Sequence, residues 1–192
     1  MNGLITLIRN LHDGVFNFIT RITEGWFLGL FARFTFVAVL YGYYFNSALT
    51  KVKIDELGIL GFFQISDGAY FQIAMPAVEA AGFDPSAVAF FPHGLIVFLG
   101  TYAEFILPAM IVIGLFSRVA AAGMIGFIIV QSLTDVFVHN IGAESTGALF
   151  DRFPDSLIMD QRLLWIFVLA VIVLKGAGKV SVDHLLSKRA SA

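Results

Sequence analysis

The sequence lacks cysteine altogether, which excludes disulfide bonds and thiolate metal ligands. Charged residues are scarce, at 14% of the 192 residues, and they form no basic cluster of the kind that binds nucleic acid. No nucleophile triad, phosphate-binding loop or dinucleotide fingerprint is present. We therefore expect no nucleic-acid partner, and the sequence carries none of these enzyme signatures.

A metal site is not expected either. The loop from Asp151 to Asp155, followed by Asp160 and Arg162, holds several carboxylates but no histidine. Carboxylates in a hydrated loop are usually solvated, so we expect salt links there. Asp160 would lie near the start of a helix, where a negative charge complements the helix dipole.

Apolar residues, by contrast, are abundant. They make up 58% of the chain, 21 of them are phenylalanine, and the mean hydropathy is +0.86. This composition indicates an integral membrane protein whose first partner is the lipid bilayer, and the length suits a single domain.

A short connector, Gly114–Arg118, separates two apolar runs, from Gly94 to Ile113 and from Val119 to Val138. Each run has about the 20 residues that a helix needs to cross a bilayer, so the pair should form a membrane hairpin. Two further spans are predicted from Leu30 to Leu49 and from Leu163 to Leu174. The predicted fold is therefore all-α, a four-helix transmembrane bundle.

Basic residues are distributed unevenly over the predicted loops. The segments on the side of the two termini hold eight basic and three acidic residues, and the two long loops hold four basic and nine acidic residues. The side richer in Lys and Arg normally faces the cytoplasm. We expect both termini in the cytoplasm, with a bacterial inner membrane as the location.

Three segments divide the chain. Apolar residues recur at three- and four-residue steps in 1–29, opposite a polar face, which predicts an amphipathic interfacial helix. A helix that docks a partner protein is the alternative. Residues 30–186 would form the four-span domain, with a long outer loop at 50–92, and 187–192 a cytoplasmic tail. Within the loop, Ser66 and Asp67 could cap a helix continuing to Ala81.

Polar residues inside the spans are the best candidates for function, because an unpaired charge in lipid is costly. Glu104 should lie about 16 Å below the outer end of its span, near the middle of a ~30 Å hydrocarbon core. We predict a polar pocket that opens toward the outer face, with Glu104 at its floor. The candidate lining residues are Asn46, Lys51, His93, Thr101, Glu104, Gln131, Asp135 and His139. The candidates for proton handling are Glu104, Asp135 and His139.

Two other interpretations of these residues stay open. Small polar clusters often only hold membrane helices together, and Lys51 with Asp135 could form a structural ion pair. Facing histidines such as His93 and His139 could hold a haem, although no companion spacing supports one. A quinone is the other cofactor considered, and none is firmly predicted.

Glu104 followed by Gly114-Leu-Phe-Ser-Arg118 resembles the glutamate and the Gly-Leu-x-Thr/Ser-Arg turn of the DoxX family. The segment Gly176-Ala-Gly-Lys-Val-Ser-Val-Asp183 is similar to that family's terminal Gly-x-Gly-x-x-Ser-x-Asp signature. Arg33, Gly42 and Lys51 resemble its first-helix pattern, although Lys51 lies about one helical turn late. The signature also suggests a local structure, in which Ser181 caps a short final helix.

The resemblance implies a four-helix membrane bundle that often serves as an accessory subunit of a larger assembly. We therefore expect a non-catalytic subunit or accessory protein of a quinone-linked, respiratory-type electron-transfer complex, with other membrane or redox subunits as partners. One alternative is a self-contained quinone-dependent oxidoreductase in which Glu104, Asp135 or His139 moves protons. The other is a small transporter or channel. Members of one fold differ in function, so fold alone does not decide between them.

Overall fold

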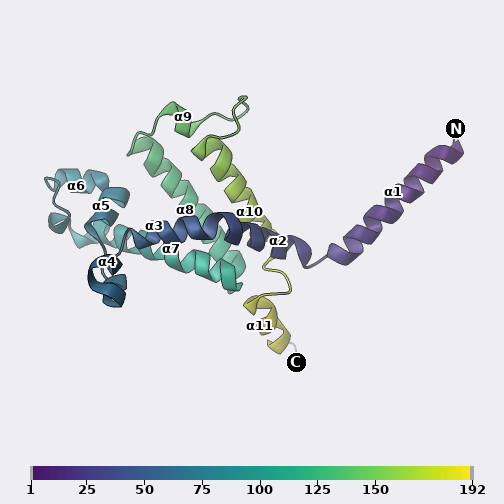
Figure 1. Ribbon diagram of the computed structural model, residues 1–192, viewed down its shortest axis with the longest axis horizontal. Coiled ribbons are helices and arrows are strands. Elements are labelled where there is room, and N and C mark those ends of the chain that lie inside the picture. The colour runs from purple at the N-terminus through teal and green to yellow at the C-terminus, as the bar shows by residue number, and fades with distance from the viewer. Residues whose placement is uncertain (1, 191–192) are drawn as a thin grey trace.

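The computed structural model describes residues 2–190, and within them the chain is helical apart from loops and one isolated bridge between Val52 and Ile65. Four helical segments are long and apolar enough to cross a membrane, and they pack as a bundle (Figure 1). The all-α, four-helix membrane fold predicted from the sequence is confirmed.

The first span joins α2 (Phe27–Phe36), a π-helical turn η1 (Val37–Tyr41) and α3 (Gly42–Leu49). The second joins a π-helical turn η4 (Phe90–Gly94) to α7 (Leu95–Ile113). The third is α8 (Ser117–Phe137), which follows α7 after a tight turn. The fourth joins a π-helical turn η5 (Leu157–Arg162) to α10 (Leu163–Lys175). It therefore begins earlier than the predicted Leu163.

Apolar packing fills the half of the bundle nearer the two termini. In lipid, close packing rather than water exclusion holds helices together, so small side chains at the contacts help. Ala120 and Ala121 serve this purpose on α8, where both are fully buried. The larger buried side chains of this core are Phe36, Leu40, Tyr44, Ile111, Met124, Ile128, Leu169 and Ile172.

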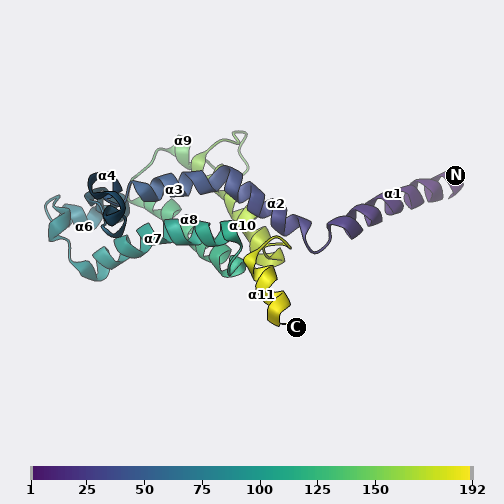
Figure 2. The same cartoon turned by 60° about the horizontal axis from the view of Figure 1, so that its bottom comes forward.

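The N-terminal helix α1 (Asn2–Thr23) precedes α2 and extends from its start away from the bundle (Figures 1 and 2). It is amphipathic, and its apolar residues, such as Leu4, Leu7 and Leu11, are more than half exposed. Gly25, with φ 76°, makes the turn between α1 and α2. An amphipathic helix whose apolar face is not covered within residues 2–190 is suited to a membrane surface or to another protein.

The outer loop holds four short helices before the second span: α4 (Ile54–Leu57), η2 (Gly58–Phe63), α5 (Asp67–Ile73) and α6 (Met75–Ala80), with a further turn η3 (Pro85–Ala87). The single helix predicted from Ser66 to Ala81 is wrong, because the chain breaks at Ala74. Pro76 has no N–H to donate to the Gln72 carbonyl, and its ring disfavours a continuous helix there. Ser66 does not cap α5; its hydroxyl donates to the Thr50 carbonyl at 3.0 Å. The second outer loop contains α9 (Ala143–Thr146).

Arg33 ties three parts of the chain together at the end of the bundle that carries the termini. Its guanidinium is buried and donates to the carbonyls of Ile111 and Ala177 at 2.9 and 3.0 Å, and to those of Val112 and Val180. Two of these carbonyls lie at the C-terminal end of α7, where the helix dipole favours a cation. Arg33 is therefore a structural residue in this fold.

The final helix α11 (Val182–Ala190) is joined to the turn between α7 and α8 through Asp183. The Asp183 carboxylate accepts from the Phe116 N–H at 2.7 Å, the Ser117 N–H at 2.9 Å and the Ser117 hydroxyl at 2.7 Å. The Asp183 N–H donates to the Gly114 carbonyl at 2.9 Å. Burial alone would raise the pKa of Asp183, but these hydrogen bonds and the charge of Arg33 outweigh it and hold the pKa below its usual range.

The two segments that resemble the family signatures thus bind each other in space. Ser181 accepts from the His184 N–H at 3.2 Å, which confirms the predicted cap of the final helix. Gly114 has φ 73°, and a Cβ added there would lie 2.5 Å from the Ser181 Cβ and 3.1 Å from the Arg33 Cζ. The turn therefore requires glycine both for its backbone conformation and for the close approach of the C-terminal segment.

Candidate functional site: a cavity in the half of the bundle away from the termini

A cavity of about 700 Å³ lies between α3, α7, α8 and the start of the fourth span. Its walls are mainly apolar and are formed by residues such as Ile96, Leu99 and Val130. Gly126 on α8 borders this space, because a Cβ added there would meet nothing within 4 Å. The size falls in the range of ligand cavities, about 300–1,000 Å³.

A buried ion pair lies at the floor of the cavity. Lys51 Nζ is 2.9 Å from Glu104 Oε2, and both side chains are at most 4% exposed. The same ammonium donates to the Ser47 hydroxyl at 2.7 Å and to the Ser47 carbonyl at 3.1 Å. Lys51 thus has a partner for each of its three N–H bonds, as a buried ammonium requires.

A second ion pair lies on another wall. Arg162 Nη2 is 2.5 Å from Asp135 Oδ2, and Arg162 Nη1 donates to the Ser132 hydroxyl at 3.0 Å. Arg162 is 2% exposed, and its Nε has no hydrogen-bond partner within residues 2–190. The ion pair that the sequence suggested between Lys51 and Asp135 is not formed, because each of these residues is paired with a different helix.

Neutral polar groups line the space between the two pairs. The Gln131 amide donates to the Tyr43 hydroxyl at 3.3 Å, and the Tyr44 hydroxyl donates to Gln131 Oε1 at 3.5 Å. Tyr44 is fully buried, whereas Tyr43 and Gln131 line the cavity. The cavity therefore offers hydrogen-bonding groups on several walls.

The helix α5 covers part of the cavity from the outer loop. A ring nitrogen of His139, at the end of the third span, lies 3.0 Å from the Gln72 carbonyl oxygen. This carbonyl is free for the contact because Pro76 cannot donate to it. Gln72 and Ile73 also line the cavity, so the hydrogen bond joins the α5 cover to α8.

Five of the predicted lining residues surround this one cavity: Lys51, Glu104, Gln131, Asp135 and His139. The other three do not line it. Asn46 and His93 are exposed elsewhere on the bundle, and Thr101 is fully buried with no hydrogen-bond partner for its hydroxyl within residues 2–190. His93 thus lies outside the cavity that His139 lines, and the two do not form one site within it.

Arg162 and the tyrosines were not among the residues predicted for the site. Arg162 was assigned to a loop because the fourth span was expected to begin after it. The usable signal was Asp135, whose charge inside a span calls for a cation near the same depth. Asp160 accepts from the Ser156 N–H at 2.9 Å and from its hydroxyl at 2.7 Å, so it stabilises the start of the fourth span as expected.

Within residues 2–190, no three His, Asp or Glu side chains are grouped so as to hold a metal ion. No family model, curated protein or solved structure matches this chain, so its function has to be inferred from its own residues.

Proposed function

We propose that the protein is a non-catalytic membrane subunit or accessory protein of a quinone-linked electron-transfer complex, and that the cavity holds the quinone head group. The observation that carries this proposal is the placement of two buried ion pairs, Lys51–Glu104 and Arg162–Asp135, around one mainly apolar cavity inside the spans. Ion pairs in lipid are costly and are retained mostly where they contribute to a site.

The chemistry of the lining suits a quinone. A quinone is a planar ring with two carbonyl oxygens, each of which accepts hydrogen bonds. Gln131 and Tyr43 bring an N–H and an O–H group to the cavity, and Lys51 holds the Glu104 carboxylate in place beside them. Glu104 and Asp135 supply carboxylates that could accept from the hydroxyls of the reduced form.

Access from the lipid supports the same ligand. Ile96, Leu99 and Val130 line the cavity, yet they are 52%, 58% and 62% exposed. An apolar rim at this level faces acyl chains, so a ligand with a long isoprenoid tail could enter sideways and leave its tail in the membrane. A water-soluble substrate has no such advantage.

The resemblance to the DoxX family supports this proposal, since members of that family are often accessory subunits and its name comes from a subunit associated with quinol oxidation. We also propose a bacterial inner membrane as the location, with both termini in the cytoplasm by the distribution of Lys and Arg. The exposed amphipathic helix α1 gives the chain a surface for a membrane or a partner subunit.

The arrangement favours a binding cavity over a channel. An apolar core that includes Phe36, Leu40 and Met124 separates the polar groups of the cavity from those at the end with the termini, such as Arg33. A self-contained oxidoreductase remains the second candidate, because Glu104 and Asp135 both reach the cavity. Turnover of a soluble quinol analogue by the isolated chain would favour it.

A binding experiment tests the proposal. Trp165 contacts Tyr43, with ring centroids 5.4 Å apart, so a Trp26→Phe background leaves one tryptophan beside the cavity. A short-chain quinone should quench this fluorescence saturably. Gly126→Leu fills the cavity and should weaken binding roughly ten-fold or more.

Gly42→Leu is the matched control, because Gly42 is also a span glycine with nothing within 4 Å of an added Cβ but does not line the cavity. Equal binding by both variants would contradict the quinone site. Mild-detergent purification with mass spectrometry should recover redox subunits, and a chain that purifies alone and binds no quinone would rule out the proposal.

A further inference from the structure

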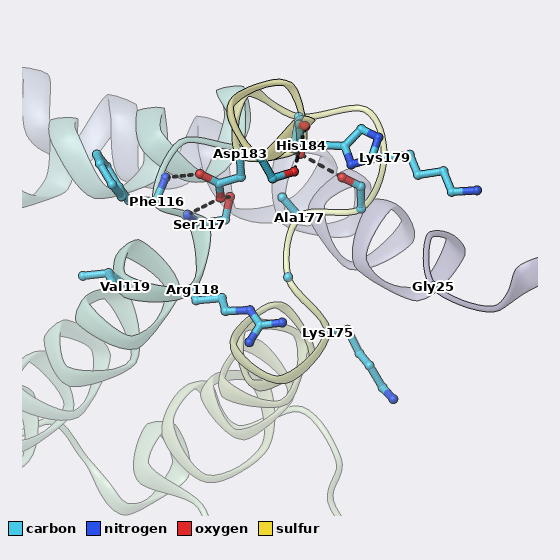
Figure 3. Close-up of a pocket in the computed structure, with 14 residues that line it drawn as sticks. Gly25, Phe116, Ser117, Arg118, Val119, Lys175, Ala177, Lys179, Asp183 and His184 are labelled. Carbon is cyan, nitrogen blue, oxygen red and sulfur yellow. Dashed lines mark hydrogen bonds between the residues drawn. The ribbon is translucent and has the colours of Figure 1, made fainter. Parts of the chain in front are cut away.

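A second cavity, of about 500 Å³, lies at the opposite end of the bundle, where both termini are (Figure 3). It is formed by the start of α8, the end of α10, the loop that leads to α11 and the turn between α1 and α2. None of the residues of the proposed quinone site lines it, so it is a separate feature that requires its own explanation.

Three basic residues line this second cavity: Arg118 from α8, Lys175 from α10 and Lys179 from the loop, and the two lysine side chains extend outward from it (Figure 3). None of them forms an ion pair with a carboxylate within residues 2–190. The one acidic lining residue is Asp183, and its two oxygens already accept hydrogen bonds from the start of α8. The cavity therefore has an excess of positive charge.

The position of these cations is that of lipid head groups. Arg118 is the second residue of α8, and Lys175 is the last residue of α10, so both mark the ends of membrane-spanning helices. Gly176 and Gly178 have φ 79° and 78° and bend the chain immediately after Lys175. The bend keeps the loop against the turn that holds Gly25, so that both line the cavity.

Apolar side chains adjoin the charged ones. Phe116 and Val119 line the same cavity and are 61% and 70% exposed, and Leu174 beside Lys175 is 73% exposed. On a membrane-spanning bundle these side chains face acyl chains. The site thus combines a cationic cavity with an apolar flank, which a free phosphate ion cannot use and an anionic phospholipid can.

We propose that this cavity binds the phosphate-bearing head group of an anionic phospholipid from the adjoining leaflet. Arg118, Lys175 and Lys179 contact the phosphate, and the acyl chains lie along Val119 and Leu174. Basic pockets at the ends of membrane helices have the charge and the depth that such recognition needs. Since the quinone cavity lies in the other half of the bundle, this site does not depend on the proposed function.

The test uses the second tryptophan of the chain. In a Trp165→Phe background, Trp26 is the only tryptophan, and it directly follows Gly25, which lines the cavity. The protein is placed in bilayers that mix phosphatidylcholine with brominated phosphatidylglycerol, and quenching gives the relative affinity for the anionic lipid. In the protein with an unmodified cavity, brominated phosphatidylglycerol should show a several-fold higher relative affinity than brominated phosphatidylcholine measured in the same way.

Arg118→Gln with Lys175→Gln should remove most of this preference, so that phosphatidylglycerol and phosphatidylcholine bind about equally. Lys188→Gln with Arg189→Gln is the control, because it removes the same charge from α11 at residues that do not line the cavity. Arg118→Lys with Lys175→Arg keeps the charge and should keep the preference. Thermal unfolding of each variant checks that the bundle is intact.

Two results would overturn the proposal. If the control pair lowers the preference as much as the cavity pair, lipid is held by diffuse surface charge and not by a site. If inorganic phosphate removes the preference while chloride at the same ionic strength does not, the cavity takes a free phosphate. A preference that depends on Arg118 and Lys175 and resists inorganic phosphate supports the lipid site.

Discussion

Lys51 Nζ lies 2.9 Å from Glu104 Oε2, and the two residues are 53 positions apart in the chain. The pair joins the end of the first span to the middle of the second at the floor of the cavity between the spans. Because both side chains are almost fully buried, each charge depends on the other for its stabilisation. The pair therefore contributes both to the stability of the bundle and to the lining of the proposed binding site.

Replacing one member of this pair should destabilise the protein strongly. Lys51→Met leaves Glu104 buried without a cation, and Glu104→Met leaves Lys51 without an anion, so each should lower the free energy of unfolding by about 3 kcal/mol or more. The double variant Lys51→Met/Glu104→Met should recover most of that loss. Unfolding of the detergent-solubilised protein measures all three.

The control for this cycle is Lys53→Met. Lys53 lies 4.0 Å from Asp67, whose side chain is 74% exposed, and an exposed pair contributes little, about 0–1 kcal/mol. If Lys51→Met proved no more harmful than Lys53→Met, the Lys51–Glu104 pair would not be a stabilising contact.

Arg33→Lys should be costly although it keeps the charge. The guanidinium of Arg33 donates to four carbonyls through three nitrogens, an arrangement that a lysine ammonium cannot reproduce. With at least two hydrogen bonds lost, the free energy of unfolding should fall by about 2 kcal/mol. Arg118→Lys, at an exposed position, is the matched control and should leave the unfolding temperature unchanged.

Gly114→Ala and Gly126→Ala should have opposite effects. At Gly114 the backbone is left-handed and an added Cβ would contact the Ser181 Cβ at 2.5 Å, so alanine should cost about 1–3 kcal/mol or more. At Gly126 the added methyl meets nothing within 4 Å, and alanine suits a helix better than glycine by about 1 kcal/mol. Equal unfolding temperatures for the two variants would show that the turn does not need glycine.

The four spans and the turn between the second and third could be predicted because length and apolar composition set them directly. The partners of the polar residues could not. The π-helical turn at 37–41 inserts extra backbone before Lys51, so a regular 3.6-residue period misplaces the direction of that side chain. The π-helical turn at 157–162 likewise brings Arg162 into the bundle, although the sequence predicts a loop at this residue.

The size of the cavity could not be predicted either. It depends on how far the helices lie apart, and glycine is found both where helices meet and where they separate. A Cβ added at Gly29 would lie 2.3 Å from the Gly176 carbonyl oxygen, whereas Gly126 borders open space. Sequence alone does not distinguish these two uses of one residue.

The contact of Asp183 with the start of α8 should make stability depend on pH. The pKa of Asp183 is held below its usual range, so its ionised form is the one that the fold stabilises. This stabilisation is fully present above the unfolded-state pKa, about 3.9, and is lost as the pH falls through the lower folded-state pKa.

Asp183→Asn removes the charge and should lower the free energy of unfolding at about pH 7 by about 0.5–2 kcal/mol. The difference from the unmodified protein should shrink as the pH falls below about 4, because both chains then carry a neutral side chain at this position. Asp55→Asn, at an exposed position on the outer loop, supplies the baseline for acid effects elsewhere in the chain. If the Asp183→Asn difference stayed constant across this range, or matched that of Asp55→Asn, the carboxylate charge would not be what joins α11 to the bundle.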